Sequence, residues 1–259
     1  MARVIAFVSG KGGVGKTTVS VNVAQSLFDS GKKVLLIDAN ITTPNISLHY
    51  SINPSKHSIH DVLGGKIDIG KVIYKTETGL MIIPGGLNFN NLKTKIKKSL
   101  SDTLLSLIDK FDYLIIDAGA GLGLEAKMAI RACEELVLVT NPDLPAITDA
   151  LRAKKIAEDF RINLLGVVIN KKTGMEFDLK DDNISDFLEL PIIGEIPFDP
   201  YVPKSIKERV PVVVGYPLSK ASKAIKRLVN NITNEELFIE DKPDNSFIKW
   251  IKKVLGLNP

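Results

Sequence analysis

The feature that most constrains this chain is a glycine-rich stretch near its N-terminus. Residues 10–18 read Gly-Lys-Gly-Gly-Val-Gly-Lys-Thr-Thr and match the pattern G-x-x-x-x-G-K-[S/T]. An apolar run at 4–8 precedes the stretch and a helical pattern at 16–29 follows it, which is the strand-to-helix context this pattern needs. Glycines let such a loop turn so that its backbone N–H groups converge on phosphate oxygens. The sequence therefore predicts a phosphate-binding loop rather than a turn that binds nothing.

The residues of this loop have distinct expected tasks. Lys16 is expected to reach the β- and γ-phosphates of a nucleotide, and the Thr17 hydroxyl is expected to bind Mg²⁺. The N-terminus of the following helix adds positive potential. We expect the loop to lie on the surface, so that replacing Lys16 leaves the fold intact. The loop residues expected to contact the nucleotide are Gly12, Gly13, Val14, Gly15, Lys16, Thr17 and Thr18.

Apolar runs of strand length alternate with longer helical patterns along the chain. The expected strands are 4–8, 34–37, 80–83, 113–116, 136–139, 165–169 and 192–196, and the expected helices are 16–29, 101–110, 124–132, 146–159, 181–188 and 219–232. Strands that are continuously apolar are typical of a parallel sheet buried on both faces. We predict an α/β fold with a doubly wound, mostly parallel sheet and helices on both faces. Its ligands should bind at the carboxyl ends of the strands.

Chain length and composition indicate how the chain is organised and which classes of protein are excluded. The 259 residues suit one large domain at 1–233, followed by a polar tether at 234–246 and an amphipathic helix at 247–259. No apolar run reaches the roughly 18–20 residues that span a bilayer, and no signal peptide is evident. The one cysteine, Cys133, excludes an intrachain disulfide and suits a reducing cytoplasm. A net charge of +4 is too weak to indicate nucleic-acid binding.

Lys11 makes the phosphate loop unusual. A lysine this early, in the form K-G-G-x-G-K-T-T, resembles the deviant Walker A motif of the MinD/ParA/nitrogenase-iron-protein family. The resemblance implies an ATPase that forms a homodimer around two ATP molecules, with Lys11 reaching the phosphates held by the partner. The alternative is that Lys11 is a solvated, variable position.

The resemblance extends over most of the chain. Residues 35–40, Leu-Leu-Ile-Asp-Ala-Asn, resemble the family's strand that ends in an Asp-x-Asp pair and opens its first switch, here residues 38–45. Residues 114–121 resemble the Walker B strand and the second switch, here residues 117–121. The family match implies that Asp38 and Asp117 join Thr17 at the Mg²⁺ ion.

Matches to the family later in the chain concern the binding of the nucleotide base. Residues 140–143, Thr-Asn-Pro-Asp, match a family turn, and the positions where the family holds adenine are Asn170, Pro197, Phe198 and Asp199. Guanine-binding sites use Asn-Lys-x-Asp, but residues 170–173 read Asn-Lys-Lys-Thr and lack that aspartate. The sequence therefore favours ATP over GTP.

Two positions depart from the family pattern. Asn40 stands where the second Asp is usual, the residue thought to position the attacking water, and Gly119 stands where a proline is usual. We expect hydrolysis to be slow because an amide cannot accept a proton, although phosphoryl transfer depends more on positioning than on a strong base. An iron–sulfur role would need at least two cysteines in the chain. His49, His57 and His60 lack metal-ligand spacing and are expected to be surface or packing residues.

The last residues form an apolar and basic segment. At 100° per residue its apolar side chains fall on one half of a helix, and the residues expected to enter a membrane are Phe247, Ile248, Trp250, Ile251, Val254 and Leu255. The segment resembles the membrane-targeting tail of MinD-type members and suits an anionic membrane surface. The alternative is a terminal helix folded onto the core. A second basic run, Lys93, Lys95, Lys97 and Lys98, is either a solvated loop or a contact for DNA or anionic lipid.

Together these features predict a slow ATP hydrolase that uses ATP and Mg²⁺ and dimerises when ATP is bound. It would cycle on and off the membrane in positioning the cell-division site or another intracellular structure, with an activator or cargo protein. It would lie in the cytoplasm and peripherally on the inner face of the cell membrane. The alternatives are a ParA-like DNA-segregation ATPase, disfavoured by the C-terminal segment, and a scaffold that binds nucleotide but barely hydrolyses it.

Overall fold

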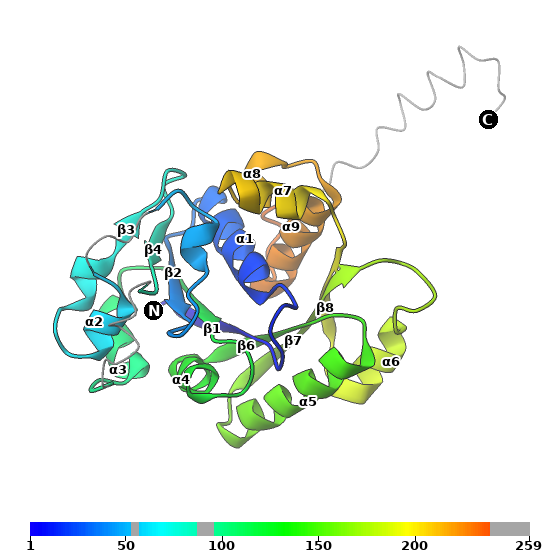
Figure 1. The fold of residues 1–259 in the computed structure, drawn as a ribbon, viewed down its shortest axis with the longest axis horizontal. Coiled ribbons are helices and arrows are strands. Elements are labelled where there is room, and N and C mark those ends of the chain that lie inside the picture. Colours follow the sequence, from blue (N-terminus) through cyan, green and yellow to red (C-terminus); the bar gives the residue numbers. More distant parts are fainter. Residues whose placement is uncertain (53–56, 87–95, 239–259) are drawn as a thin grey trace, which may run out of the picture.

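A computed structural model describes residues 1–52, 57–86 and 96–238 (Figure 1). The expected C-terminal helix, together with Lys93 and Lys95, lies outside the described residues. The strands are β1 (Arg3–Val8), β2 (Val34–Ala39), β3 (Tyr74–Lys75), β4 (Met81–Ile83), β5 (Tyr113–Ala118), β6 (Glu135–Thr140), β7 (Asn163–Lys172) and β8 (Ile192–Pro197). They form one eight-stranded sheet in the order β3-β4-β2-β5-β1-β6-β7-β8. All neighbours are parallel except the β3–β4 pair, which is antiparallel. The predicted fold class is confirmed.

Helices cover both faces of this sheet (Figure 1). They are α1 (Lys16–Asp29), α2 (Ile59–Leu63), α3 (Leu100–Leu104), α4 (Leu124–Ala132), α5 (Leu144–Asp159), α6 (Asp181–Leu188), α7 (Tyr201–Glu208), α8 (Val212–Gly215) and α9 (Lys220–Thr233), with 3₁₀ turns η1 (Ile46–Leu48), η2 (Ile69–Val72) and η4 (Leu105–Leu107). The helix expected at 101–110 is shorter than predicted, because α3 gives way to η4 after Leu104. β3, α2, α7 and α8 are not among the predicted elements, and each has eight residues or fewer.

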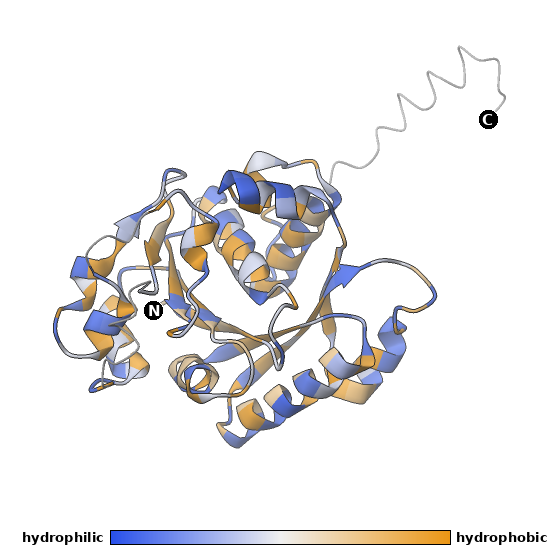
Figure 2. Ribbon diagram, in the orientation of Figure 1, coloured by the Kyte–Doolittle hydropathy of each residue, from blue (hydrophilic) through white to orange (hydrophobic). Residues whose placement is uncertain are grey.

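The alternation of side chains along each strand divides the core into two layers. In β1, Val4, Ala6 and Val8 pack into the layer under α4 and α5, whereas Ile5 and Phe7 pack into the layer under α1 and α9. Figure 2 shows apolar residues concentrated on the strands and on the helix faces that meet them. Burial on both faces explains why strands such as β1 and β5 have continuous apolar runs rather than an alternation of apolar and polar residues.

Strand order and register decide which loops meet. β1 lies between β5 and β6, and β2 lies on the far side of β5. In register, Asp117 on β5 is paired with both Phe7 on β1 and Asp38 on β2. Because the strands are parallel, the phosphate loop after β1 and both switches start at the same edge of the sheet.

The residues after α9 remain in contact with the domain. Asn234 ends α9 in the left-handed conformation. The Asn230 amide then donates to the Phe238 carbonyl at 2.7 Å and accepts from the Phe238 N–H at 3.0 Å. Lys32 forms an ion pair with Glu235 at 2.7 Å. The chain therefore keeps its contacts with the domain through residue 238, although the predicted tether begins at 234.

Candidate functional site

The phosphate loop is shaped by glycines in the left-handed conformation. Gly13 has φ 84° and Gly15 has φ 91°, values that a side chain would strain. A Cβ atom on Gly15 would also collide with the amide of Asn170. That amide donates to the Val14 carbonyl at 2.7 Å, and Lys171 Nζ donates to the Gly13 carbonyl at 2.7 Å. The end of β7 thus supports the loop from outside.

Asp117 is the centre of a buried polar cluster at the start of α1. Lys16 Nζ lies 2.7 Å from Asp117 Oδ1, and the Thr17 hydroxyl donates to Asp117 Oδ2 at 2.6 Å. The Ser20 hydroxyl donates to Oδ1 at 3.0 Å. Residues 11–13 of the loop are exposed, whereas Lys16 is only 5% exposed and Asp117 is fully buried. A buried lysine needs a counter-charge, and Asp117 supplies it.

Asp38 fixes the backbone of the first switch. Its carboxylate accepts hydrogen bonds at 3.1 Å from the N–H groups of Asn40, Asn45 and Ile46. Burial and the neighbouring Asp117 carboxylate raise the pKa of Asp38 to about 7. The aspartate therefore joins the end of β2 to the first residue of η1.

The same cluster has the donor set that Mg²⁺ prefers. Two buried carboxylates, Asp38 and Asp117, and the Thr17 hydroxyl are hard oxygen ligands. Protein sites commonly hold Mg²⁺ through one or two carboxylates and the phosphates of a substrate. The residues present therefore fit a Mg²⁺ ion that is bound together with a nucleotide.

A pocket of about 650 Å³ opens above the phosphate loop. Its lining includes every loop residue predicted to contact nucleotide, together with Asn170, Pro197, Phe198 and Asp199. Asn40 lines the pocket, is 3% exposed and accepts from the Thr43 N–H at 3.1 Å. Lys11 is exposed and does not line this pocket.

The four predicted base-binding residues have different surroundings. Asn170 is buried with its amide against the loop, whereas Phe198 is 60% exposed at the pocket wall. The Asp199 carboxylate accepts from the backbone N–H groups of Tyr201 and Ala221, each at 2.9 Å. Asp199 thus holds the starts of α7 and α9, and we propose that its contribution to base binding comes through the backbone around it.

Part of the pocket wall comes from residues that were not predicted from the sequence. Val202, Pro203 and Ile206 come from α7, and Asn45, Leu48 and His49 come from η1 and its flanks. The spacing of Val202 and Ile206 after Pro200 is a signal for a short amphipathic helix. For η1 no local pattern shows that its residues return to the loop.

Other residues singled out from the sequence lie away from this pocket. Cys133 is buried, and burial raises the pKa of its thiol to about 12. Lys97 and Lys98 are exposed. Within the described ranges, no group of three or more His, Cys, Asp or Glu side chains could hold a metal ion. None of the helices in that part of the chain has the length and hydropathy to cross a bilayer.

His49 gives the site a dependence on pH. The ring is 5% exposed and its Nδ1 atom has no hydrogen-bond partner in the described structure. Burial lowers the pKa of His49 from 6.5 to about 4, and the negative charge of Asp117 only partly offsets this. Between these two values the unfolded chain binds a proton that the folded chain does not.

We predict that this histidine lowers the free energy of unfolding by about 3 kcal/mol as the pH falls from about 6.5 to 4. Asp38 acts in the opposite sense, because its raised pKa makes the folded chain bind more protons in that range. The quantity to measure is therefore the difference in urea-unfolding free energy between wild type and His49→Phe at each pH. As the pH falls, the variant should become more stable relative to wild type. A difference independent of pH would contradict the prediction.

Comparison with known proteins identifies a matching family profile and similar sequences. A family profile described as ParA, a NUBPL iron-transfer P-loop NTPase, matches residues 1–233. An uncharacterized ATP-binding protein of Methanocaldococcus jannaschii is 34% identical over 258 residues, which is 99% of this chain and 98% of the relative.

Solved structures show the same similarity. The septum site-determining protein MinD of Pyrococcus horikoshii, complexed with Mg-ADP, superposes with a TM-score of 0.85. It is 33% identical over 90% of this chain and 96% of that chain. MinD from the MinC:MinD cell division complex of Aquifex aeolicus has a TM-score of 0.80 and 28% identity, over 92% of this chain and 98% of that chain.

Proposed function

The chain belongs to the MinD/ParA family of P-loop NTPases, and from that premise we propose that it is an ATP-dependent dimerising switch. It would hydrolyse ATP slowly and cycle on and off a membrane to position the cell-division site or another structure. The observation that carries this proposal is the cluster at Asp117, where the phosphate loop and both switches meet. The similarity to septum-site proteins supports the positioning role.

The contacts of Asp117 explain how nucleotide would reach both switches. Lys16 and Thr17 both bind this carboxylate in the structure, and they are the groups that phosphate oxygens and Mg²⁺ would engage. When ATP takes these two groups, the hydrogen bonds of Asp117 rearrange at the start of the second switch. Asp38 is the register partner of Asp117 and holds the first switch by three backbone N–H groups, so the change reaches that segment as well.

Thr17, Asp117 and Asp38 would hold the Mg²⁺ ion. Bound there, Mg²⁺ neutralises charge on the phosphate oxygens of the nucleotide. Lys16 carries the positive charge to the β- and γ-phosphates, and the loop N–H groups orient them. Asn40 at the pocket wall would orient water through its amide, which supports slow rather than rapid hydrolysis.

We predict that ATP, but not ADP, drives the protein into a symmetric dimer that requires Lys11. The Lys11 side chain is exposed and does not line the pocket of its own chain, which supports the proposal that it reaches the phosphates of a second copy. Lys11→Ala should keep ATP affinity within about threefold while weakening the dimer on the order of a hundredfold, the loss expected for charge-assisted hydrogen bonds.

Light scattering with ATP and with ADP measures this effect. Lys33→Ala is the matched control, because it removes an exposed lysine at the opposite, amino end of β2. The dimer should survive in that control. The same oligomer with ATP, with ADP and in Lys11→Ala would rule out the dimerising switch.

A protein partner is part of the proposal. The Aquifex aeolicus relative is seen in complex with MinC, and we propose that this chain also binds an activator or cargo protein when it carries ATP. Capture with the ATP-bound dimer would identify it. The alternative ligand is DNA, which Lys97 and Lys98 would contact. If the protein bound DNA and not liposomes, the segregation function would be favoured.

A further inference from the structure

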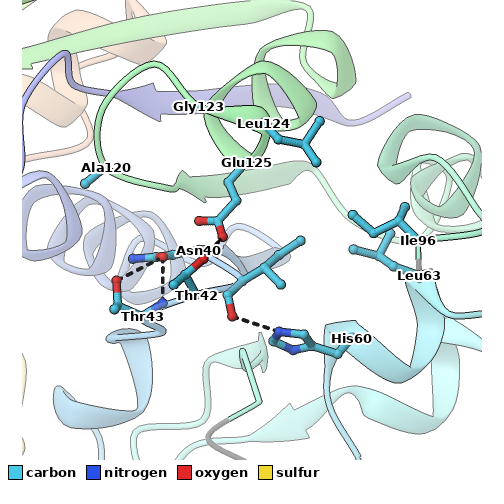
Figure 3. Close-up of a pocket in the computed structure, with 11 residues that line it drawn as sticks. Asn40, Thr42, Thr43, His60, Leu63, Ile96, Ala120, Gly123, Leu124 and Glu125 are labelled. Atoms are coloured by element: carbon cyan, nitrogen blue, oxygen red, sulfur yellow. Dashed lines mark hydrogen bonds between the residues drawn. The ribbon is translucent and has the colours of Figure 1, made fainter. Parts of the chain in front are cut away.

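A second cavity lies beside the nucleotide pocket, between the two switches. Its volume is about 760 Å³, and it shares Asn40, Thr43 and Ala120 with the nucleotide pocket. Figure 3 shows the side chain of Glu125, from α4, reaching toward the first switch across this cavity. Since Asn40 belongs to both walls, a contact made in the second cavity can affect the nucleotide pocket.

Glu125 joins the segment after the second switch to the first switch. It is the second residue of α4, and its carboxylate accepts a hydrogen bond from the Thr42 hydroxyl (Figure 3). Thr42 is two residues after Asn40 in the first switch. The link therefore connects the two segments that the proposed nucleotide cycle must move together.

Gly119 makes room for this glutamate. A Cβ atom at position 119 would lie 2.5 Å from Glu125 Oε2 and 2.7 Å from Glu125 Cβ, far inside contact distance. Gly119 is not among the glycines with positive φ, so its backbone conformation does not require a glycine. The close approach of the Glu125 side chain does require a residue without a Cβ atom. A proline ring, usual in the resembling family, would collide with the same side chain.

The first switch is also held from its other side. The His60 Nδ1 atom accepts from the Gly86 N–H at 3.1 Å, so the ring proton is on Nε2, which donates to the Ile41 carbonyl at 2.8 Å. Asn40 Oδ1 accepts from the N–H and the hydroxyl of Thr43. Residues 40–43 are thus anchored by α2 on one side and by Glu125 on the other.

We propose that Glu125 is a positioning residue that couples the two switches. Through Thr42 it fixes the first switch so that Asn40 faces the nucleotide pocket. Of the two departures from the family pattern, Gly119 makes room for this carboxylate, and Asn40 is the residue whose position the carboxylate fixes through Thr42. The inference rests on the proposed function, because ATP hydrolysis is the reaction that this positioning serves.

The kinetic test is a double-mutant cycle. Glu125→Ala and Thr42→Val should each lower kcat roughly tenfold, because a displaced positioning group costs rate rather than binding. KM for ATP should stay within about twofold, since neither residue contacts the phosphate loop. The double variant should be no slower than the slower single variant, and Thr42→Ser should keep the wild-type rate. Glu134→Ala, which removes an exposed glutamate beyond the other end of α4, is the control.

A second readout separates this proposal from the proposed function. Hydrogen exchange of the amides at 41–45 reports how firmly the first switch is held, whether or not ATP is hydrolysed. Glu125→Ala should speed that exchange, and Glu134→Ala should not. If wild type exchanges as expected but does not hydrolyse ATP, the proposed function fails while the coupling stands. Unchanged exchange in Glu125→Ala, or additive losses of kcat in the double variant, would overturn the role of Glu125.

Discussion

Replacing Lys16 with alanine is expected to lower the affinity for Mg-ATP on the order of a hundredfold or more. A charge-assisted hydrogen bond contributes about 1.5–3 kcal/mol, and Lys16 is expected to bind two phosphate groups. Isothermal titration calorimetry with Mg-ATP measures the loss. Lys171→Ala is the matched control, because it removes another ammonium group from the same pocket, where Lys171 contacts the Gly13 carbonyl. Its effect should be much smaller. Normal ATP binding by Lys16→Ala would refute the nucleotide-site assignment.

The same substitution should also destabilise the fold. Lys16 and Asp117 form a buried ion pair, and removing one partner of such a pair typically costs about 3–5 kcal/mol, because the other charge is left buried. The binding experiment therefore has to be run well below the melting temperature of the variant. The double variant Lys16→Ala/Asp117→Asn should recover stability without recovering affinity. Recovery of both would mean that Lys16 has only a structural role.

Wild-type protein with ATP is expected to float with anionic liposomes, whereas protein with ADP stays in solution. The apolar residues of 247–257 would enter the interface, and each lysine would add about 1 kcal/mol near anionic lipid. One such segment binds weakly. Two on one dimer act at high effective concentration, which can raise the combined affinity by roughly 10²–10⁴. ATP would therefore control membrane residence through dimerisation alone.

Trp250→Glu and a truncation after Asn245 test this expectation. Both should still dimerise with ATP but lose flotation, and Trp250→Phe should keep it, because phenylalanine preserves the apolar face. Binding of wild type should weaken in high salt and on neutral lipid, since lysines supply part of the attraction. Flotation of the truncated protein, or none of wild type with either nucleotide, would leave the C-terminal segment without a membrane role.

Local patterns in the sequence were sufficient to predict the phosphate loop and the longer strands and helices. The loop at 10–18 was identifiable because its glycines, Lys16 and Thr17 are neighbours in the chain and need no distant contact to be recognised. Strands such as β5 were predictable from their continuous apolar runs, and helices such as α1 and α4 from the apolar periodicity of the face that packs on the sheet. Short elements such as α2 and β3 were missed, since five and two residues carry too little periodicity.

The contacts within the site were decided only by the tertiary structure. Lys16 and Asp117 are 101 residues apart, and they meet because β1 is inserted beside β5 in a particular register. The same order of strands places Asp38 beside Asp117, and the packing of α4 brings Glu125 over Gly119 to Thr42. Local periodicity specifies that a strand is buried, but not which strand it pairs with. For that reason the sequence could predict the phosphate loop, whereas the burial of Lys16 and the link between the switches follow only from the way distant segments pack.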